Sequence, residues 1–363
     1  MRRAAALLAL GAALLLCAAA FASPSLAVPG VALVTVGVLA PVWAALAARG
    51  ATIARRIEPR QVQEGEPVSA TIVVGGGALP SPGASVEDPV LGEVTAAGSA
   101  VLRGDETFGR RGRRRLAPAR RVVRDPLGVV RRVAAQTGPD EILVLPRVEP
   151  VDLPPELSGS PVRGPARAGA VEAALDFDGL GPYRPGAPVS RIHWAGLARH
   201  DELMERRFRA EREPLPLVVL DARDPAGEDA FEDAVRAAAS LAAALIGVRG
   251  CRVLLAGDSR GVVLDADGRG WPALHGRLAL VEPDERVPSP AVLAGAGAVL
   301  WVTAARRPLL PSPLEQTAAQ RPSYLVTPHA LPGGPAFAAA ACRAWRLGHP
   351  QRPVGVSTAG AIA

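Results

Sequence analysis

Asp221 is the residue with the clearest chemical potential, because it ends the apolar stretch PLPLVVLD and precedes the polar sequence ARDP. Such a stretch predicts a buried strand, and open α/β sheets bind ligands at the carboxyl ends of their strands. An aspartate there, followed by hydroxyl side chains at alternate positions, would supply the oxygen ligands that Mg²⁺ prefers. The alternate positions hold Arg223 and Pro225, so a magnesium site needs Asp224 as a substitute ligand. One hypothesis is therefore a metal-assisted hydrolase that uses Asp221 and Asp224.

A structural role for Asp221 is the alternative. Its carboxylate suits a cap of the turn or of the following helix, where acidic groups favour the positive N-terminal end. Elsewhere, Asp176, Asp178 and His193 offer carboxylates and an imidazole for acid–base hydrolysis, but no nucleophile accompanies them. The chain contains no GxxxxGK[ST], GxSxG or HExxH motif, and the serine of GDSRG, 257–261, is expected in a hairpin turn.

The elements that position Asp221 alternate between apolar strands and helices over residues 214–363. This pattern predicts a doubly wound α/β domain with a parallel sheet covered on both faces. The expected strands are 214–222, 251–258, 261–267, 296–304 and 322–328. The expected helices are 228–248, 271–281, 312–320 and 335–348.

Residues 51–150 show a different pattern, with short strands separated by Gly and Pro clusters, and they predict a small β-sandwich. The expected strands are 52–60, 67–74, 84–90, 114–125 and 141–148. The basic run 110–124 suggests phosphate or nucleic-acid binding, or proximity to anionic lipid. It lacks interleaved aromatic residues, however, so arginines on the solvent face of a strand are the favoured interpretation and a nucleic-acid partner is not expected. Residues 151–175 are rich in Pro and Gly and predict a linker.

Two uncharged segments, 4–22 and 23–48, are each long enough to span a bilayer, and the short SPS sequence that joins them predicts a helical hairpin over residues 1–50. Basic residues precede the first segment and follow the second, which places both ends and the soluble part in the cytoplasm: Arg2, Arg3, Arg49, Arg55, Arg56 and Arg60. The alternative is a signal peptide cleaved near Ala22. Either way the lipid bilayer is an expected partner.

The composition narrows the function classes further. Three cysteines, Cys17, Cys251 and Cys342, lie far apart and predict neither a disulfide framework nor a zinc site, which fits a reducing compartment. The formal net charge is +6, which keeps anionic lipid and nucleic acid among the partners to be considered.

Residues 176–221 resemble the signature region of the bacterial domain-of-unknown-function-58 family. The segment RDPLGVVRR, 124–132, is similar to that family's Arg-Asp-Pro-hydrophobic-Gly segment, and two N-terminal spans ahead of a β-rich domain also fit, so the likeness covers nearly the whole chain. The matching signature residues are Tyr183, Pro185, Gly186, Arg191, Ile192, Trp194, Ala198 and Arg199. The chain departs from the family at Pro182, Ala187 and His193, where acidic residues are usual, and is a divergent member by this resemblance.

The resemblance implies a von Willebrand factor A-like fold for residues 214–363. It also implies a membrane-anchored, non-enzymatic adaptor without a required cofactor, which works with a MoxR-type AAA+ ATPase and with other membrane or envelope proteins. Aromatic and arginine side chains are typical anchors of interfaces. The candidate partner-binding residues, all in the signature segment 176–213, are Tyr183, Arg184, Arg191, Trp194 and Arg199. The alternative is that Phe177, Ile192 and Trp194 are buried between the β-rich domain and the α/β domain. The arginines would then pair with Glu202, Glu205 and Glu211.

Overall fold

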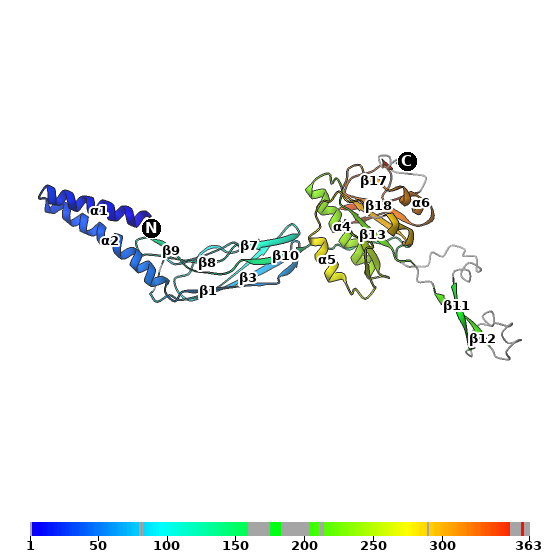
Figure 1. Cartoon of the computed structure of the whole chain (residues 1–363), viewed down its shortest axis with the longest axis horizontal. Coiled ribbons are helices and arrows are strands. Elements are labelled where there is room, and N and C mark those ends of the chain that lie inside the picture. The colour runs from blue at the N-terminus through cyan, green and yellow to red at the C-terminus, as the bar shows by residue number, and fades with distance from the viewer. Residues whose placement is uncertain are drawn as a thin grey trace. The chain divides into compact units, whose positions relative to one another are not determined.

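The computed structural model of the 363-residue chain divides it into two compact units (Figure 1). The first comprises Met1–Arg147 and His275–Leu280, and the second comprises Val148–Leu274 and Val281–Ala363. The structure describes residues 2–79, 81, 83–158, 175–182, 204–210, 214–288, 290–348 and 357–358.

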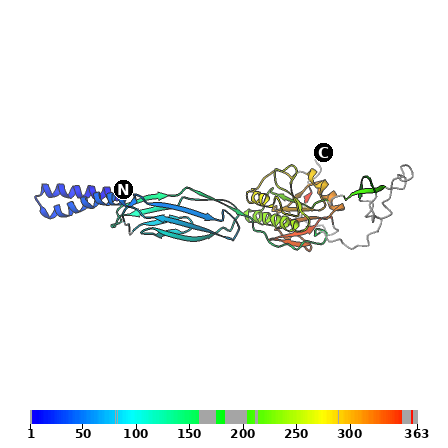
Figure 2. The same ribbon diagram turned by 90° about the horizontal axis from the view of Figure 1, so that it is seen from below.

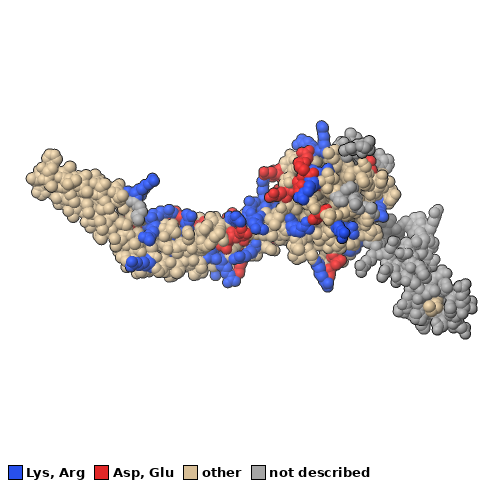
Figure 3. All heavy atoms as spheres, viewed as in Figure 1, with Lys and Arg blue, Asp and Glu red and all other residues tan. Residues whose placement is uncertain are grey.

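Two apolar helices begin the first unit, α1 (Arg2–Ala20) and α2 (Pro24–Ala48), as the sequence predicts. Both are long and apolar enough to cross a membrane. They lie side by side as a hairpin in both ribbon views, and charged atoms are nearly absent from the face seen in Figure 3 (Figures 1–3). Glycine permits their close approach, since a Cβ on Gly11 would lie 2.8 Å from Val34 Cγ2 and 2.9 Å from the Gly30 carbonyl oxygen.

Three small sheets form the β-rich part of the first unit, in the orders β1-β3-β6, β2-β10-β7 and β5-β4-β8-β9. Two apolar clusters form its core, one around Ile142 and Val144 and the other around Ile72 and Val86. The strands are β1 (Thr52–Glu58), β2 (Gln61–Gln63), β3 (Pro67–Gly75), β4 (Ser85–Asp88), β5 (Gly92–Thr95), β6 (Ala100–Thr107), β7 (Gly112–Leu116), β8 (Arg120–Arg124), β9 (Arg131–Gln136) and β10 (Asp140–Leu145).

The predicted strand 114–125 is in fact two strands in different sheets, β7 and β8. The break contains Pro118, which has no backbone N–H to donate to a ladder. The sequence interpretation also missed β2, β5, β6 and β9, which are short or rich in exposed polar residues and do not stand out as an apolar pattern.

A seven-stranded mixed sheet in the order β15-β14-β13-β16-β18-β20-β19 forms the centre of the second unit. Its strands β14, β13, β16 and β18 run parallel, whereas β15 and β20 run antiparallel to their neighbours. The strands are β13 (Leu217–Asp221), β14 (Cys251–Leu254), β15 (Val262–Leu264), β16 (Val299–Thr303), β18 (Ser323–Thr327), β19 (Phe337–Ala339) and β20 (Cys342–Arg346). The centre of the sheet is parallel, as expected, and the hairpin turn expected at 257–261 joins the antiparallel pair β14 and β15. The antiparallel strands β20 and β19 at the other edge were not expected.

Helices cover this sheet. Leu217 and Val219 of β13 belong to an apolar cluster that includes residues of η2 (Pro290–Gly295) and α6 (Ser312–Gln320). The intervening Val218 and Leu220 are also fully buried and point to the opposite face, as alternation along a strand requires. The long helix α4 (Glu228–Ile246) contacts β13, β14, β16 and β18 (Figure 1). The shorter α5 (Trp271–Ala279) follows β15.

Residues 335–348 are not the predicted helix. They form the hairpin of β19 and β20, with Ala340 at a positive φ of 49° in the turn. The alanines favour a helix only weakly, and tertiary context overrides such a preference. Here the open edge of β18 carries unpaired backbone groups, and β20 satisfies them with Trp345 opposite Leu325.

Two further pairs of short strands belong to the second unit. β11 (Leu175–Pro182) and β12 (Met204–Ala210) pair antiparallel, with an irregularity between Phe177 and Gly179. β17 (Leu309–Leu310) pairs in parallel with β21 (Ser357–Thr358).

Candidate functional site

Asp221 lies where the winding of the sheet reverses. The chain passes from β13 to β14 on one side, and later returns to place β16 on the other side. In open α/β sheets this arrangement opens a crevice at the carboxyl ends of the two central strands. Asp221 is the last residue of β13, and it pairs in register with Thr303, the last residue of β16. The structure thus puts Asp221 at the edge that the sequence indicated.

The carboxylate of Asp221 is only 2% exposed and both of its oxygens accept hydrogen bonds. Oδ1 accepts from Arg223 Nε at 2.8 Å and from the Arg223 backbone N–H at 3.2 Å. Oδ2 accepts from Arg223 Nη2 at 2.8 Å and from Trp301 Nε1 at 3.2 Å. Arg223 and Asp221 therefore form a bidentate ion pair, which is the strongest arrangement of an arginine and a carboxylate.

These four hydrogen bonds use about all the acceptor positions that a carboxylate offers. A cation that bound Asp221 would have to displace the Arg223 guanidinium, so the donor set does not fit a magnesium ion. Among the described residues, no group of three or more His, Cys, Asp or Glu side chains could hold a metal ion. The structural alternative for Asp221 was a cap of the turn or of the following helix. Asp221 does cap the turn, because its carboxylate accepts a hydrogen bond from the Arg223 backbone N–H. It does not cap α4, whose N-cap residue is Gly227.

The Arg223 side chain has a second hydrogen-bond partner. Besides Asp221, its Nη2 donates to the Leu309 carbonyl oxygen at 3.0 Å. The hydrogen bond to Asp221 raises the pKa of Arg223, while partial burial lowers it and the charges of Asp221 and Glu285 raise it. The guanidinium therefore stays charged and the pair is internally neutral, with 17% of the Arg223 side chain exposed.

Asp224, the proposed second ligand, is exposed in the turn after β13, and its φ of 42° lies in the left-handed region. The same turn is fixed to the residues that follow β16: Pro225 forms a bridge with Ala305, and the Ala226 N–H donates to the Ala304 oxygen at 3.0 Å. A left-handed aspartate is common in turns, so this position has a backbone explanation.

Other charged groups surround this edge. The backbone N–H of Asp284 donates to the Ala222 oxygen at 3.1 Å, which brings residues 284–286 beside the end of β13. Asp284 and Arg286 form an exposed ion pair at 2.6 Å, and the hydrogen bonds from Arg286 lower the pKa of Asp284. The rim is consequently mixed in charge, and two of its ion pairs are Asp221–Arg223 and Asp284–Arg286.

The five candidate partner-binding residues, Tyr183, Arg184, Arg191, Trp194 and Arg199, lie outside the described residues, as does His193. The structure does describe the two strands that flank them, β11 and β12, with Phe177 opposite Phe208. The signature segment therefore begins and ends in one antiparallel pair.

The basic run 110–124 is largely paired within the first unit. Arg113 and Arg115 contact Glu141 at 3.5 and 2.8 Å, across the β7–β10 pair. Arg124 contacts Glu93 at 2.7 Å, and Arg121 is buried, so that desolvation lowers its pKa. The exposed Arg113 and Arg115 match the interpretation of arginines on the solvent face of a strand, whereas the buried Arg111 and Arg121 do not.

Sequence reasoning missed the roles of Arg223 and Trp301. Arg223 was read only as the loss of a metal-binding hydroxyl, although an arginine two residues after a buried aspartate is itself a signal for a local ion pair. No signal in the sequence singled out Trp301, because its donor role depends on β16 lying beside β13.

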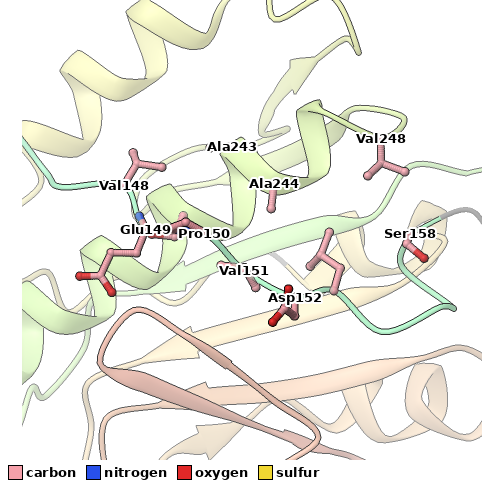
Figure 4. A pocket seen from close by; sticks show the side chains of 11 residues that line it. Val148, Glu149, Pro150, Val151, Asp152, Ser158, Ala243, Ala244 and Val248 are labelled. Carbon is pink, nitrogen blue, oxygen red and sulfur yellow. The ribbon is translucent and has the colours of Figure 1, made fainter.

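A hollow lies in the second unit, between α4 and the segment 148–158 (Figure 4). It has a volume of about 600 Å³, and the small side chains of Ala243 and Ala244 line it on the helix side. The segment is attached to α4 by the Glu149 N–H, which donates to Ser240 Oγ at 2.9 Å.

No protein-family model matches the chain, and no curated protein matches it either.

Proposed function

We propose that the chain is a membrane-anchored adaptor that binds protein partners and performs no chemistry of its own. The observation that carries this proposal is the state of Asp221, whose acceptor positions are taken by Arg223 and Trp301. A carboxylate fixed in this way is poorly suited to hold a metal ion or to move a proton. The edge of the sheet where the strand order reverses then offers a rim of mixed charge, which serves binding rather than catalysis.

The order of the strands supports a von Willebrand factor A-like fold for the second unit. From one edge, five strands follow in the order third, second, first, fourth and fifth of the seven-stranded sheet, as in doubly wound folds. The resemblance of residues 176–221 to the domain-of-unknown-function-58 family adds the proposal that a MoxR-type AAA+ ATPase is the partner and that the pair assembles or remodels protein complexes.

The helical hairpin supports the anchor, and we place both of its ends on the cytoplasmic side. Arg2, Arg3 and Arg49 are exposed next to the helix ends, in agreement with the preference of basic residues for that side. Arg55 does not contribute to this preference, because its side chain is fully buried among the β-strands.

We propose that the signature segment carries the partner surface, with Tyr183, Trp194, Arg184, Arg191 and Arg199 as its anchors. Acidic side chains of the ATPase would pair with the arginines.

Binding of the purified MoxR-type ATPase from the same organism to the full-length chain in nanodiscs tests the proposal. We expect saturable binding that Arg191→Glu abolishes. The matched control is Arg343→Glu, because Arg343 is exposed on β20 and its reversal leaves the signature segment intact. Absence of binding to the unmodified chain, or an equal loss in both variants, would overturn the proposed partner surface.

A further inference from the structure

The loop between β8 and β9 contacts the second half of α2. Val130 of the loop belongs to one apolar cluster with Ala40 and Ala44 of α2. Two hydrogen bonds within the loop fix its backbone, because the Asp125 carboxylate accepts from the backbone N–H groups of Leu127 and Val130. Gly128, at a φ of 67°, allows the tight turn. Leu127 is nevertheless 67% exposed.

An apolar hollow of about 380 Å³ lies where this loop meets α2. Its lining residues are Thr35, Val36, Leu39, Ala40, Val42, Trp43, Leu46, Asp125, Pro126 and Leu127. Buried water needs two to four polar partners, and two of the three polar side chains that line the hollow are already engaged. Thr35 Oγ1 donates to the Val31 oxygen at 2.8 Å, and Asp125 is occupied by its own loop. The hollow therefore favours hydrocarbon over water.

The indole N–H of Trp43 requires a hydrogen-bond acceptor from whatever fills the hollow. The indole Nε1 is buried and has no hydrogen-bond partner in the described part of the chain. A buried donor without an acceptor is costly, so the occupant should carry an acceptor oxygen next to its apolar part. An acyl chain with its ester carbonyl has this combination.

The depth of the hollow fits the same ligand. Trp43 and Ala40 precede the end of α2 at Ala48 by five and eight residues, or about 8 and 12 Å of helix rise. Half of a hydrocarbon core is about 15 Å thick, and tryptophan prefers the interfacial level. The exposed Arg49, directly after α2, lies where a lipid phosphate is expected.

We propose that this hollow, formed by α2 and the loop 125–130, holds one acyl chain of a phospholipid from the cytoplasmic leaflet. The inference rests on the proposed insertion of α1 and α2 into a bilayer, since only there is hydrocarbon the surrounding medium. Its consequence is that Pro126 and Leu127 dip into the membrane and fix the β-rich part of the first unit against its surface.

Photolabelling tests the proposal on the full-length chain in vesicles of phospholipid with a diazirine-bearing acyl chain. We expect label on residues 125–127 and on Trp43, located by peptide mass spectrometry. Val36→Phe fills the hollow and should abolish the label on residues 125–127. The matched control is Val38→Phe on the same helix, because Val38 is 47% exposed and does not line the hollow. Trp43→Phe, which keeps the ring and removes the donor, should weaken the labelling of the loop.

The outcomes separate this inference from the anchor itself. If labels appear on α1 and α2 but never on residues 125–127, or if Val36→Phe leaves the label on the loop unchanged, the hollow holds no acyl chain although the helices are inserted. If no residue of α1 or α2 is labelled and the chain fails to float with the vesicles, the membrane anchor fails and the inference fails with it.

Discussion

Each of the two units buries an arginine against a carboxylate, but the partners are distributed very differently. In the first unit, the fully buried side chain of Arg55 contacts Asp88 at 2.7 Å and Asp140 at 2.8 Å, from three different strands. Its Nη1 also donates to the Ala117 oxygen at 2.8 Å. In the second unit, Arg223 and Asp221 are two residues apart in one turn. The first pair joins distant segments, whereas the second closes a local turn.

This difference separates a structural ion pair from one that defines a site. Arg55 and Asp140 are 85 residues apart in the chain, so the pair depends on the folding of the β-rich part of the first unit. Asp221 and Arg223 pair within one turn. The main effect of this pair is that the Arg223 charge neutralises the Asp221 carboxylate at the carboxyl end of β13. Removal of one arginine should therefore unfold a domain, while removal of the other should expose a binding position.

Arg55→Met gives the largest expected effect. It leaves Asp88, whose side chain is fully buried, without its counterion, and breaking such a pair costs about 3–5 kcal/mol of unfolding free energy. Urea unfolding of the full-length chain in detergent, followed by pulse proteolysis, measures the change. The control Arg56→Met removes an exposed pair with Glu58 and should cost less than about 1 kcal/mol. Equal effects of the two substitutions would contradict the structural role of Arg55.

Arg223→Ser should have a smaller effect, about 2 kcal/mol, because Arg223 binds one carboxylate whereas Arg55 binds two. Asp221 also keeps the hydrogen bonds from Trp301 and from the backbone N–H at position 223. Hydrogen exchange of peptides that cover β13 measures the loss in the second unit, with Arg343→Ser as the control. A loss as large as that of Arg55→Met would mean that the local pair also holds its unit together.

Mild acid should weaken the first unit through His275. Burial lowers the pKa of His275, and the hydrogen bond between its Nε2 and the Pro146 oxygen, at 2.8 Å, raises it in part. Because the net shift is downward, the unfolded chain takes up a proton before the folded chain does. Stability is thus complete above the ordinary histidine pKa of about 6.5 and falls as the pH decreases toward the folded value.

The unfolding midpoint at pH 7.5 and pH 5.5, compared between the full-length chain and His275→Gln, isolates this contribution. We expect a smaller loss of stability on acidification in the variant. An identical pH dependence of the two proteins would show that His275 is not linked to folding.

Glu141→Gln should have the smallest effect. It weakens the exposed contacts with Arg113 and Arg115, which are worth less than about 1 kcal/mol and are screened by salt. The midpoint of urea unfolding in 50 mM and 500 mM NaCl measures it. A loss above 2 kcal/mol that persists in high salt would place these surface arginines in the same class as Arg55.

The sequence predicts much of the fold because its strongest patterns are local. The two uncharged segments became α1 and α2, and the apolar stretch ending at Asp221 became β13. The failures occurred where distant pairing decides the outcome. The alanine-rich residues 335–348 form β19 and β20 because β18 offers an open edge, which no local pattern reports.

The sequence predicted the position of Asp221 at the end of a strand, but it did not predict the hydrogen bonds that occupy its carboxylate. The end of a buried strand located Asp221, yet its engagement by four hydrogen bonds depends on the rotamer of Arg223 and on Trp301 from another strand. Arg55 shows the same limit, because it was read as a membrane-proximal charge from its place in the chain. Its burial becomes evident only when β4 and β10 are placed around it.

Calorimetric titration of MgCl₂ into the full-length chain tests most directly whether the switch point works without a metal ion. Since Arg223 already saturates Asp221, we predict no saturable heat, and no difference between the unmodified chain and Asp221→Asn. Saturable binding that disappears in Asp221→Asn would show that a cation displaces the guanidinium. It would contradict the proposal of an adaptor in which Arg223 occupies the Asp221 carboxylate.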